Sequence, residues 1–163
     1  PPRSTLFPYT TLFRSRFTLR GREAGVTVID DYGHHPNEIK AVLKAARQIA
    51  EKRIAVLFQP HRYSRTKALF DQFLTAFHDT DMLFVMDIYA ASERPIEGVS
   101  AEALCDGIRL RGHKRALHTP DREKIPDLIV QSLQPGDMLI TLGAGDVTRM
   151  GPLILEHLKT KKN

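Results

Sequence analysis

The sequence predicts an α/β protein with a Rossmann-like, doubly wound and mostly parallel sheet covered by helices on both faces. From Arg16 onward, strand and helix signals alternate along the chain. Residues 54–58 are continuously apolar, as expected for a parallel strand buried on both faces, and 82–86 and 138–142 give further strong strand signals. Strands that alternate with amphipathic helices favour parallel pairing through helical crossovers.

The strands and helices can be assigned in order from periodicity and end signals. We expect strands at 16–20 (a short edge strand), 26–30, 54–58, 82–86, 115–118 (weak) and 138–142. A first helix follows 26–30, with its apolar face formed by Ile39, Val42, Leu43, Ala46, Ile49 and Ala50. A second should face the core with Ala68, Leu69, Phe73, Ala76 and Phe77. Further helices are expected at 100–111, from the Thr119-Pro120-Asp121 start to about Leu133, and at the end of the chain.

Residues 1–15 form a leader that does not fit this pattern. They show neither a helical nor a strand period, lack an initiating methionine and contain no continuous apolar region typical of a secretion signal. Residues 4–15 look like translated sequencing-adapter read-through joined to a truncated reading frame, and we expect the leader to be poorly ordered. The sequence therefore predicts one domain over 16–163, which is a fragment of a longer protein.

Composition excludes several classes of protein. Hydrophobic residues make up 42% and charged residues 26%, as in ordinary globular domains. The net charge of +5 is not accompanied by interleaved basic and aromatic residues, so nucleic-acid binding is not predicted. The single cysteine, Cys105, excludes an internal disulfide and fits a reducing compartment. No apolar run is long enough to span a membrane. We expect a cytoplasmic protein.

The turn at 30–38, Asp-Asp-Tyr-Gly-His-His-Pro-Asn-Glu, carries more chemistry than a connection requires. It places two carboxylates, a phenol and two imidazoles between a strand and a helix, and Pro36 suits the first turn of that helix. Open α/β sheets bind ligands at the carboxyl ends of their strands. A plainer explanation is that His35 and Asn37 only cap the helix while the aspartates are solvated.

Polar turns also follow the next strong strands. Residues 59–66 (Gln-Pro-His-Arg-Tyr-Ser-Arg-Thr), 87–93 (Asp-Ile-Tyr-Ala-Ala-Ser-Glu) and 143–146 (Gly-Ala-Gly-Asp) each come directly after an apolar run. In a parallel sheet these turns and the first one meet at one edge. Four such turns on one edge predict a binding site there.

Each turn suggests a chemistry and a plainer alternative. Arg62 and Arg65, three residues apart beside His61, suit a carboxylate or phosphate because guanidinium groups donate paired hydrogen bonds; surface salt bridges are the alternative. Gly143 and Gly145, with Asp146, would let backbone N–H groups approach an anion, or would form only a tight packing turn.

Two nucleotide motifs are missing and one metal site is weakly suggested. Thr148 replaces the third glycine of a dinucleotide fingerprint, and no G-x-x-x-x-G-K-[ST] phosphate loop occurs. A metal site built from His34, His35, His61, Asp31 and Asp87 is a minority interpretation, because no recognised ligand spacing supports it.

Taken together and in this order, the four turns resemble the C-terminal domain of the Mur ligases, which build the peptidoglycan stem peptide. The segments are 30–36, 59–66, 87–91 and 143–146, and the resemblance extends over nearly all of 16–163. It is most similar to the members that join L-alanine to UDP-N-acetylmuramate. Ser92 stands where the family usually has glycine, and Asn37 where threonine is common.

The resemblance implies an ATP-dependent, amide-forming ligase in which ATP phosphorylates the muramoyl carboxylate and the amine of L-alanine attacks the acyl phosphate. ATP and Mg²⁺ would be held mainly by a central domain absent from this chain, so the fragment alone is expected to be inactive. By the resemblance, His61, Arg62 and Arg65 would hold the carboxylate of L-alanine, and Tyr32 and His34 would lie near its amine and the forming bond. Asp31 would contact the ATP ribose, and Arg16 would reach the γ-phosphate.

Three alternatives remain open from sequence. The chain could be the corresponding domain of the ligase that recycles murein tripeptide, which shares the His-His-Pro turn. It could be a stand-alone, non-catalytic module that binds an anion or amino acid at the same edge. A metal-dependent hydrolase is third.

Overall fold

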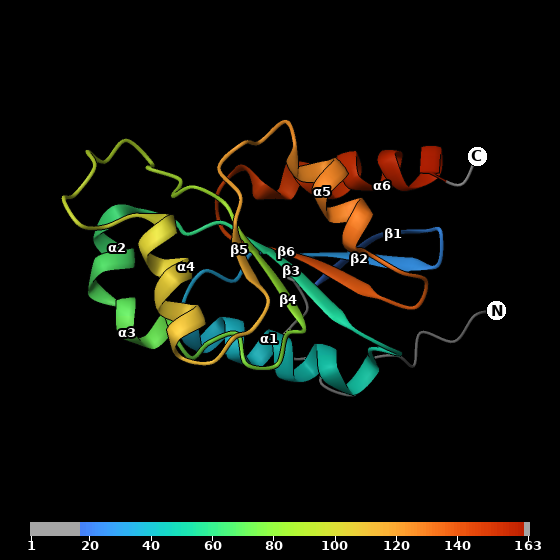
Figure 1. Ribbon diagram of the computed structural model, residues 1–163, viewed down its shortest axis with the longest axis horizontal. Helices are drawn as coiled ribbons and strands as arrows, with labels where there is room; N and C mark the ends of the chain where they lie inside the picture. Colours follow the sequence, from blue (N-terminus) through green and yellow to red (C-terminus); the bar gives the residue numbers. More distant parts are fainter. Residues whose placement is uncertain (1–16, 162–163) are drawn as a thin grey trace.

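Short apolar runs form the inner strands of the sheet in the computed structural model, which describes residues 17–161. Six strands lie within that range: β1 (Thr18–Glu23), β2 (Val26–Asp31), β3 (Ile54–Phe58), β4 (Met82–Val85), β5 (Ala116–His118) and β6 (Met138–Leu142). They form one sheet in the order β1-β2-β6-β3-β4-β5 (Figure 1). Strands β2 to β6 are parallel, and β1 pairs antiparallel with β2 at the edge. The predicted mostly parallel α/β fold is confirmed. The predicted leader 1–15, and Arg16, lie outside the described residues.

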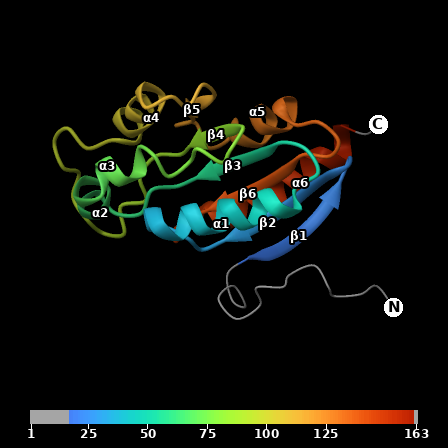
Figure 2. The same ribbon diagram turned by 90° about the horizontal axis from the view of Figure 1, so that it is seen from below.

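Helices cover both faces of the sheet, as predicted (Figures 1 and 2). They are α1 (Pro36–Ile49), α2 (Tyr63–Ala68), α3 (Phe70–Phe73), α4 (Ala101–Leu110), α5 (Ile125–Ser132) and α6 (Met150–Lys161), with a 3₁₀ turn η1 (Asp146–Arg149) before α6. One apolar core joins the sheet to α1, α3 and α4, and a second joins it to α5 and α6. Residues of β3 alternate between the two cores, which explains why all five are buried.

Three sequence-based boundaries are wrong in part. Strand β1 runs to Glu23 instead of ending at residue 20, because Ala24 and Gly25 adopt left-handed conformations (φ +50° and +77°) that close a tight hairpin onto β2. The helix after β3 breaks at Leu69, whose φ of −111° ends α2. Ala68 is consequently exposed and does not face the core, whereas Thr66 is buried.

The helix expected from Thr119-Pro120-Asp121 begins six residues later, at Ile125. The Thr119 backbone N–H and hydroxyl both donate to the carbonyl oxygen of Val85, at 2.8 and 3.1 Å. Thr119 therefore continues the edge of the sheet and does not cap a helix. Pro126 occupies the first turn of α5, a position where proline is tolerated.

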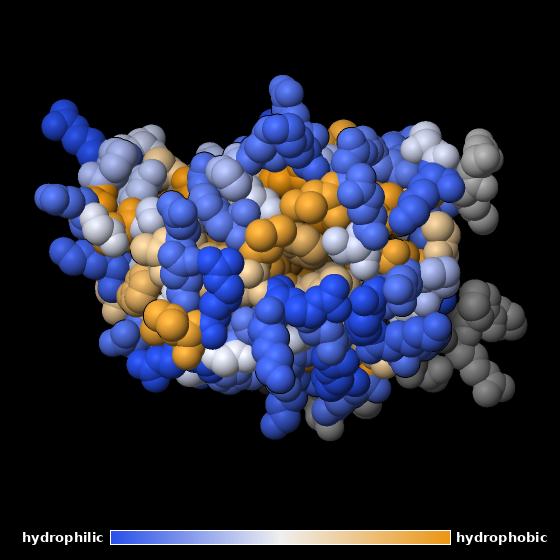
Figure 3. Space-filling view, viewed as in Figure 1, coloured by the Kyte–Doolittle hydropathy of each residue, from blue (hydrophilic) through white to orange (hydrophobic). Residues whose placement is uncertain are grey.

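The face of the sheet that packs against α5 and α6 is less completely covered near the edge strand β5. Leu117, on β5, is 43% exposed although Ala116 beside it is buried. Figure 3 shows apolar surface gathered in a hollow on this side of the molecule, framed by polar side chains. Within residues 17–161, no helix is long and apolar enough to cross a lipid bilayer.

The strand register makes the carboxyl ends of the inner strands level. Asp31 lies beside Leu142, Leu142 beside Phe58, and Phe58 beside Val85. The turns that follow β2, β3, β4 and β6 therefore begin at one edge of the sheet, on the side of α2 in Figure 1. We call this edge the rim.

Candidate functional site

Backbone hydrogen bonds join the four rim turns to one another. The N–H of Gln59 donates to the carbonyl oxygen of Leu142 at 3.0 Å, and that of Gly143 donates to Asp31 at 3.2 Å. The N–H of Tyr89 donates to Pro60 at 2.8 Å. The rim is thus a connected surface, as parallel pairing predicted.

His35 begins helix α1, so the plain capping explanation holds for this residue. Its Nδ1 accepts from the N–H of Asn37 at 3.2 Å, while the carboxylate of Glu38 accepts from the N–H groups of His34 and His35 at 3.1 and 3.2 Å. Pro36 occupies the first turn. These reciprocal bonds satisfy backbone donors that the helix itself leaves unpaired.

The two aspartates of the first turn are not solvated, contrary to the plain alternative. Asp31 is 1% exposed and its Oδ1 accepts from the N–H of Gly33 at 2.7 Å. The Asp30 carboxylate accepts from Arg20 (3.0 Å), Thr141 (2.6 Å) and Thr148 (2.8 Å). Both carboxylates therefore fix the turn. The predicted contact between Asp31 and a nucleotide ribose stays a prediction, and it would require Asp31 to leave its buried position.

Aromatic rings from three turns meet on the rim. The Tyr32 and His34 rings are perpendicular with centroids 5.5 Å apart, and the His34 and His61 centroids are 5.9 Å apart. The ring of Tyr89 stacks on His61 at 5.5 Å with 12° between the planes. Three of the predicted site residues, Tyr32, His34 and His61, are brought together in this way.

The arginine turn supports this cluster. Arg65 Nη1 lies 3.0 Å from His61 Nδ1, and the N–H of Arg62 donates to the carbonyl oxygen of Tyr89 at 2.8 Å. Arg62 has a φ of +70°, a left-handed backbone conformation that is unfavourable for a residue with a side chain. Between the two arginines, Ser64 donates its N–H and hydroxyl to Glu93. Hydrogen bonds from Ser64 lower the pKa of the Glu93 carboxyl.

The glycines of the fourth turn are explained by packing. Gly143 has a φ of +145°, and a Cβ there would lie 2.8 Å from the carbonyl oxygen of Gln59. A Cβ at Gly145 would lie 2.5 Å from Gln59 Oε1 and 2.8 Å from Tyr89 Cγ. The N–H of Val147 already donates to Gln59 Oε1 at 3.0 Å. The tight-packing alternative is favoured, and anion binding by Gly143, Gly145 and Asp146 stays a prediction.

Gln59, Tyr89 and Glu93 matter to this geometry but were not singled out from sequence. Gln59 is 5% exposed and donates from Nε2 to Asp146 Oδ1 at 2.8 Å, linking the second turn to the fourth. Tyr89 and Glu93 link the third turn to the second. Their position within polar turns was the available signal, since each lies within or next to a segment that carries the family resemblance.

Asp146 should contribute to acid sensitivity. Burial opposes ionisation, but hydrogen bonds from Gln59 and Arg122 hold the pKa of its carboxyl below the ordinary value. A depressed folded-state pKa gives stability that is present above the unfolded pKa of about 3.9 and is lost as pH falls through the folded pKa. We expect Asp146→Asn to flatten the acid limb below about pH 4, measured by urea unfolding of this chain at a series of pH values. The exposed Asp71→Asn is the control; parallel curves for wild type and Asp146→Asn would contradict this expectation.

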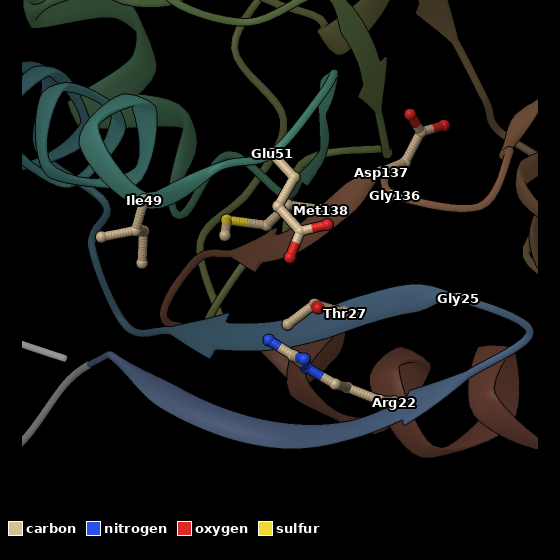
Figure 4. Close-up of a pocket in the computed structure, with 8 residues that line it drawn as sticks. All are labelled: Arg22, Gly25, Thr27, Ile49, Glu51, Gly136, Asp137 and Met138. Carbon is tan, nitrogen blue, oxygen red and sulfur yellow. The ribbon is translucent and has the colours of Figure 1, made fainter. Parts of the chain in front are cut away.

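A cavity of about 300 Å³ lies at the opposite edge of the sheet (Figure 4). It is lined by Arg22, Gly25, Thr27, Ile49, Glu51, Gly136, Asp137 and Met138. The side chains of Arg22 and Glu51 extend toward one another from its two sides. Asp137 is 1% exposed and bound to Arg53 Nη2 at 2.5 Å, so its carboxylate serves the fold. The rim, where polar groups from four turns converge, is the better candidate.

The suggested metal ligands do not come together as a set. Across residues 17–161, no group of three or more His, Cys, Asp or Glu side chains is arranged to hold a metal ion. His34 and His61 face each other, His35 caps α1, and Asp87 pairs with His118 Nε2 at 2.7 Å.

Comparison with known families shows to which protein family the chain belongs. A family model described as Mur ligase, glutamate ligase domain, matches residues 15–145. The chain belongs to the Mur ligase family. The resemblance inferred from the four turns is confirmed.

Relatives of this chain are named ligases. It is 55% identical over 144 residues to the UDP-N-acetylmuramate–L-alanine ligase of Syntrophus aciditrophicus (strain SB), covering 88% of this chain and 30% of the relative. A solved UDP-N-acetylmuramate-alanine ligase from Thermotoga maritima shares the fold, with a TM-score of 0.71, 24% identity, and coverage of 89% and 30%. A further ligase from Thermotoga maritima, solved in complex with ADP, aligns with a TM-score of 0.59 and 19% identity over 88% and 31%. The chain thus spans about a third of the length of the Mur ligases it matches.

Proposed function

We propose that this chain is the amino-acid-binding C-terminal domain of an ATP-dependent ligase that joins L-alanine to UDP-N-acetylmuramate. One observation carries the proposal: Arg62, Arg65 and His61 lie beside Tyr32 and His34 on one rim, in a chain with 55% identity to a named L-alanine ligase. The rim offers cationic donors at one side and imidazole and phenol groups at the other. An amino acid matches this arrangement, because its carboxylate would bind the cationic donors and its amine would lie at the imidazole and phenol groups.

In this proposal Arg62 and Arg65, with His61, hold the carboxylate of L-alanine. Guanidinium groups suit this task because they remain charged and donate in a planar fork. Tyr32, which is 53% exposed, and His34 lie beside this position and face the amine and the forming amide bond. Closure of the rim against the rest of the enzyme would exclude water from the reaction.

ATP and Mg²⁺ are assigned to the remainder of the full-length protein. The sequence of this chain contains no phosphate loop to cradle a triphosphate. The predicted γ-phosphate contact of Arg16 stays a prediction. A reaction that consumes ATP and a UDP-linked sugar is expected in the cytoplasm.

ADP release by the full-length protein tests the proposal. Release should require L-alanine, UDP-N-acetylmuramate and ATP together, and the 163-residue chain alone should give none. L-alaninamide, which keeps the amine but lacks the carboxylate, should be a much poorer substrate. Turnover with the murein tripeptide instead of L-alanine would support the recycling ligase, and equal turnover of L-alanine and L-alaninamide would contradict carboxylate binding.

A further inference from the structure

The two imidazoles of the rim have opposite hydrogen-bonding partners. His34 Nδ1 lies 3.0 Å from the carbonyl oxygen of Tyr32, which can only accept, so this nitrogen carries a proton. His61 Nδ1 lies 3.0 Å from Arg65 Nη1, which can only donate, so this nitrogen must accept. In the neutral rings, His34 therefore has a lone pair on Nε2, whereas His61 has its proton on Nε2.

The surroundings of each ring maintain this difference. Burial, followed by the charges of Arg65, His34 and Arg62, lowers the pKa of His61, while Glu93 on the neighbouring turn opposes them. His61 is thus a neutral donor near pH 7. His34 Nδ1 is also 3.9 Å from the Glu38 carboxylate, which favours a proton on that nitrogen.

Tyr89, from the third turn, holds His61 in place through its ring and its backbone. Its ring stacks on the imidazole, and its backbone N–H and carbonyl oxygen bond to Pro60 and Arg62, the two residues that flank His61, each at 2.8 Å. Gly145 packs against the Tyr89 ring, with no room for a Cβ. The orientation of the imidazole is therefore fixed by contacts with two other turns.

We propose that His34 and His61 distinguish the two ends of the amino acid by their opposite tautomers, and that Tyr89 is the positioning residue for His61. This inference rests on the proposed function. His61 Nε2–H donates to the carboxylate, and the lone pair of His34 Nε2 receives a proton from the ammonium group. The electron pair of the broken N–H bond stays on the amine, which becomes a nucleophile, and His34 becomes an imidazolium whose Nδ1–H still donates to the carbonyl oxygen of Tyr32.

Long-range ¹H–¹⁵N spectra of the imidazoles in this chain test the tautomers without any substrate. We expect His34 to be protonated on Nδ1 and His61 on Nε2, whereas the exposed His78 should show a mixture. Tyr89→Ala should give His61 a mixture too, and Tyr89→Phe, which keeps the stacked ring, should restore the single tautomer. Identical tautomers at His34 and His61, or an unchanged His61 spectrum in Tyr89→Ala, would overturn the inference.

Gly145→Ala tests the same positioning from the other side of the Tyr89 ring. The added methyl group would lie 2.5 Å from Gln59 Oε1 and 2.8 Å from Tyr89 Cγ, so both the Gln59 amide and the ring stacked on His61 must move away. The His61 spectrum of Gly145→Ala should therefore resemble that of Tyr89→Ala. A displaced Tyr89 ring with a wild-type His61 spectrum would mean that Tyr89 does not position His61.

Kinetics of the full-length ligase test the roles. His34→Gln keeps an acceptor but cannot take a proton, so kcat should fall by about a hundredfold or more while KM for L-alanine changes little. His61→Gln keeps a donor and should recover part of the roughly tenfold rise in KM expected for His61→Ala. His78→Asn is the matched control. A wild-type kcat for His34→Gln would overturn this inference but not the proposed function. If the wild-type enzyme shows no turnover that depends on L-alanine, the proposed function is overturned, while the tautomers seen by NMR still stand.

Discussion

Arg65→Ala in the full-length ligase is expected to lower kcat/KM for L-alanine by about ten- to a hundredfold, equivalent to about 1.4–2.7 kcal/mol. On the proposed function, the variant removes a charged donor from the substrate carboxylate in a site closed to water. It also removes the hydrogen bond to His61 Nδ1, which would otherwise keep the His61 proton on Nε2. The loss should therefore be at least as large as for Arg62→Ala.

Arg62 requires a control for its backbone. Because its φ is +70°, alanine at this position would be as strained as arginine, whereas glycine would not. Arg62→Gly should thus lose activity like Arg62→Ala while matching or exceeding the wild-type stability. Arg62→Lys should recover only part of the activity, since an ammonium group keeps the charge but loses the planar fork.

Comparing the kinetic parameters for L-alanine and ATP shows which substrate the arginines serve. KM for ATP should change little in all arginine variants, because the proposed function assigns the nucleotide to the remainder of the full-length protein. The exposed Arg111→Ala, at the opposite end of the sheet, serves as the matched control. Equal damage to the L-alanine and ATP parameters in a folded variant would show that the arginines serve domain closure or phosphate. Wild-type kinetics for both Arg62→Ala and Arg65→Ala would reduce them to surface charges.

The parts of the fold that burial dictates were predictable from sequence. Strands β3 and β4 are continuously apolar and β6 is apolar apart from Thr141, as suits strands covered by helices on both faces, and this pattern is visible in the chain itself. Parallel pairing then places the following turns at one edge, so the position of the rim did not require coordinates. The first turn of α1 was equally clear, since proline and a capping side chain have a local cause.

The features set by contacts between turns could not be predicted. Nothing near Asp31 in sequence indicates that its carboxylate turns inward to the N–H of Gly33. Gln59 becomes important only because Asp146 and Val147 approach it from 87 and 88 residues away. Likewise, Thr119 and Pro120 form a good helix start locally, but the edge of β4 offers the Thr119 N–H a partner. Ser92 adopts a φ of +69°, which accounts physically for the glycine usual there in the family.

Phe58→Ala should lower the free energy of unfolding of this chain by about 3–5 kcal/mol, the usual range for a large aromatic side chain removed from a core. Phe58 is fully buried at the end of β3, and its ring lies 5.6 Å from the ring of Phe73 and 5.0 Å from that of Phe77. The rings of this trio join the short helix α3 and the segment after it to the sheet. Removing the Phe58 ring leaves a cavity bordered by α3 and the segment after it.

Urea unfolding at 25 °C measures this loss, and two further variants separate its causes. Phe58→Leu retains most of the apolar volume and should lose only about 1.5 kcal/mol or less. Leu110→Ala, at a position 87% exposed, should stay within about 0.5 kcal/mol of wild type. Because domains of this size are stable by only about 5–15 kcal/mol, Phe58→Ala should leave a chain with little reserve against unfolding. Phe58 also directly precedes the turn that carries His61, so its loss should broaden the His61 imidazole signals even where the chain stays folded. A loss below about 1 kcal/mol would show that the aromatic trio does not hold α3 against the sheet.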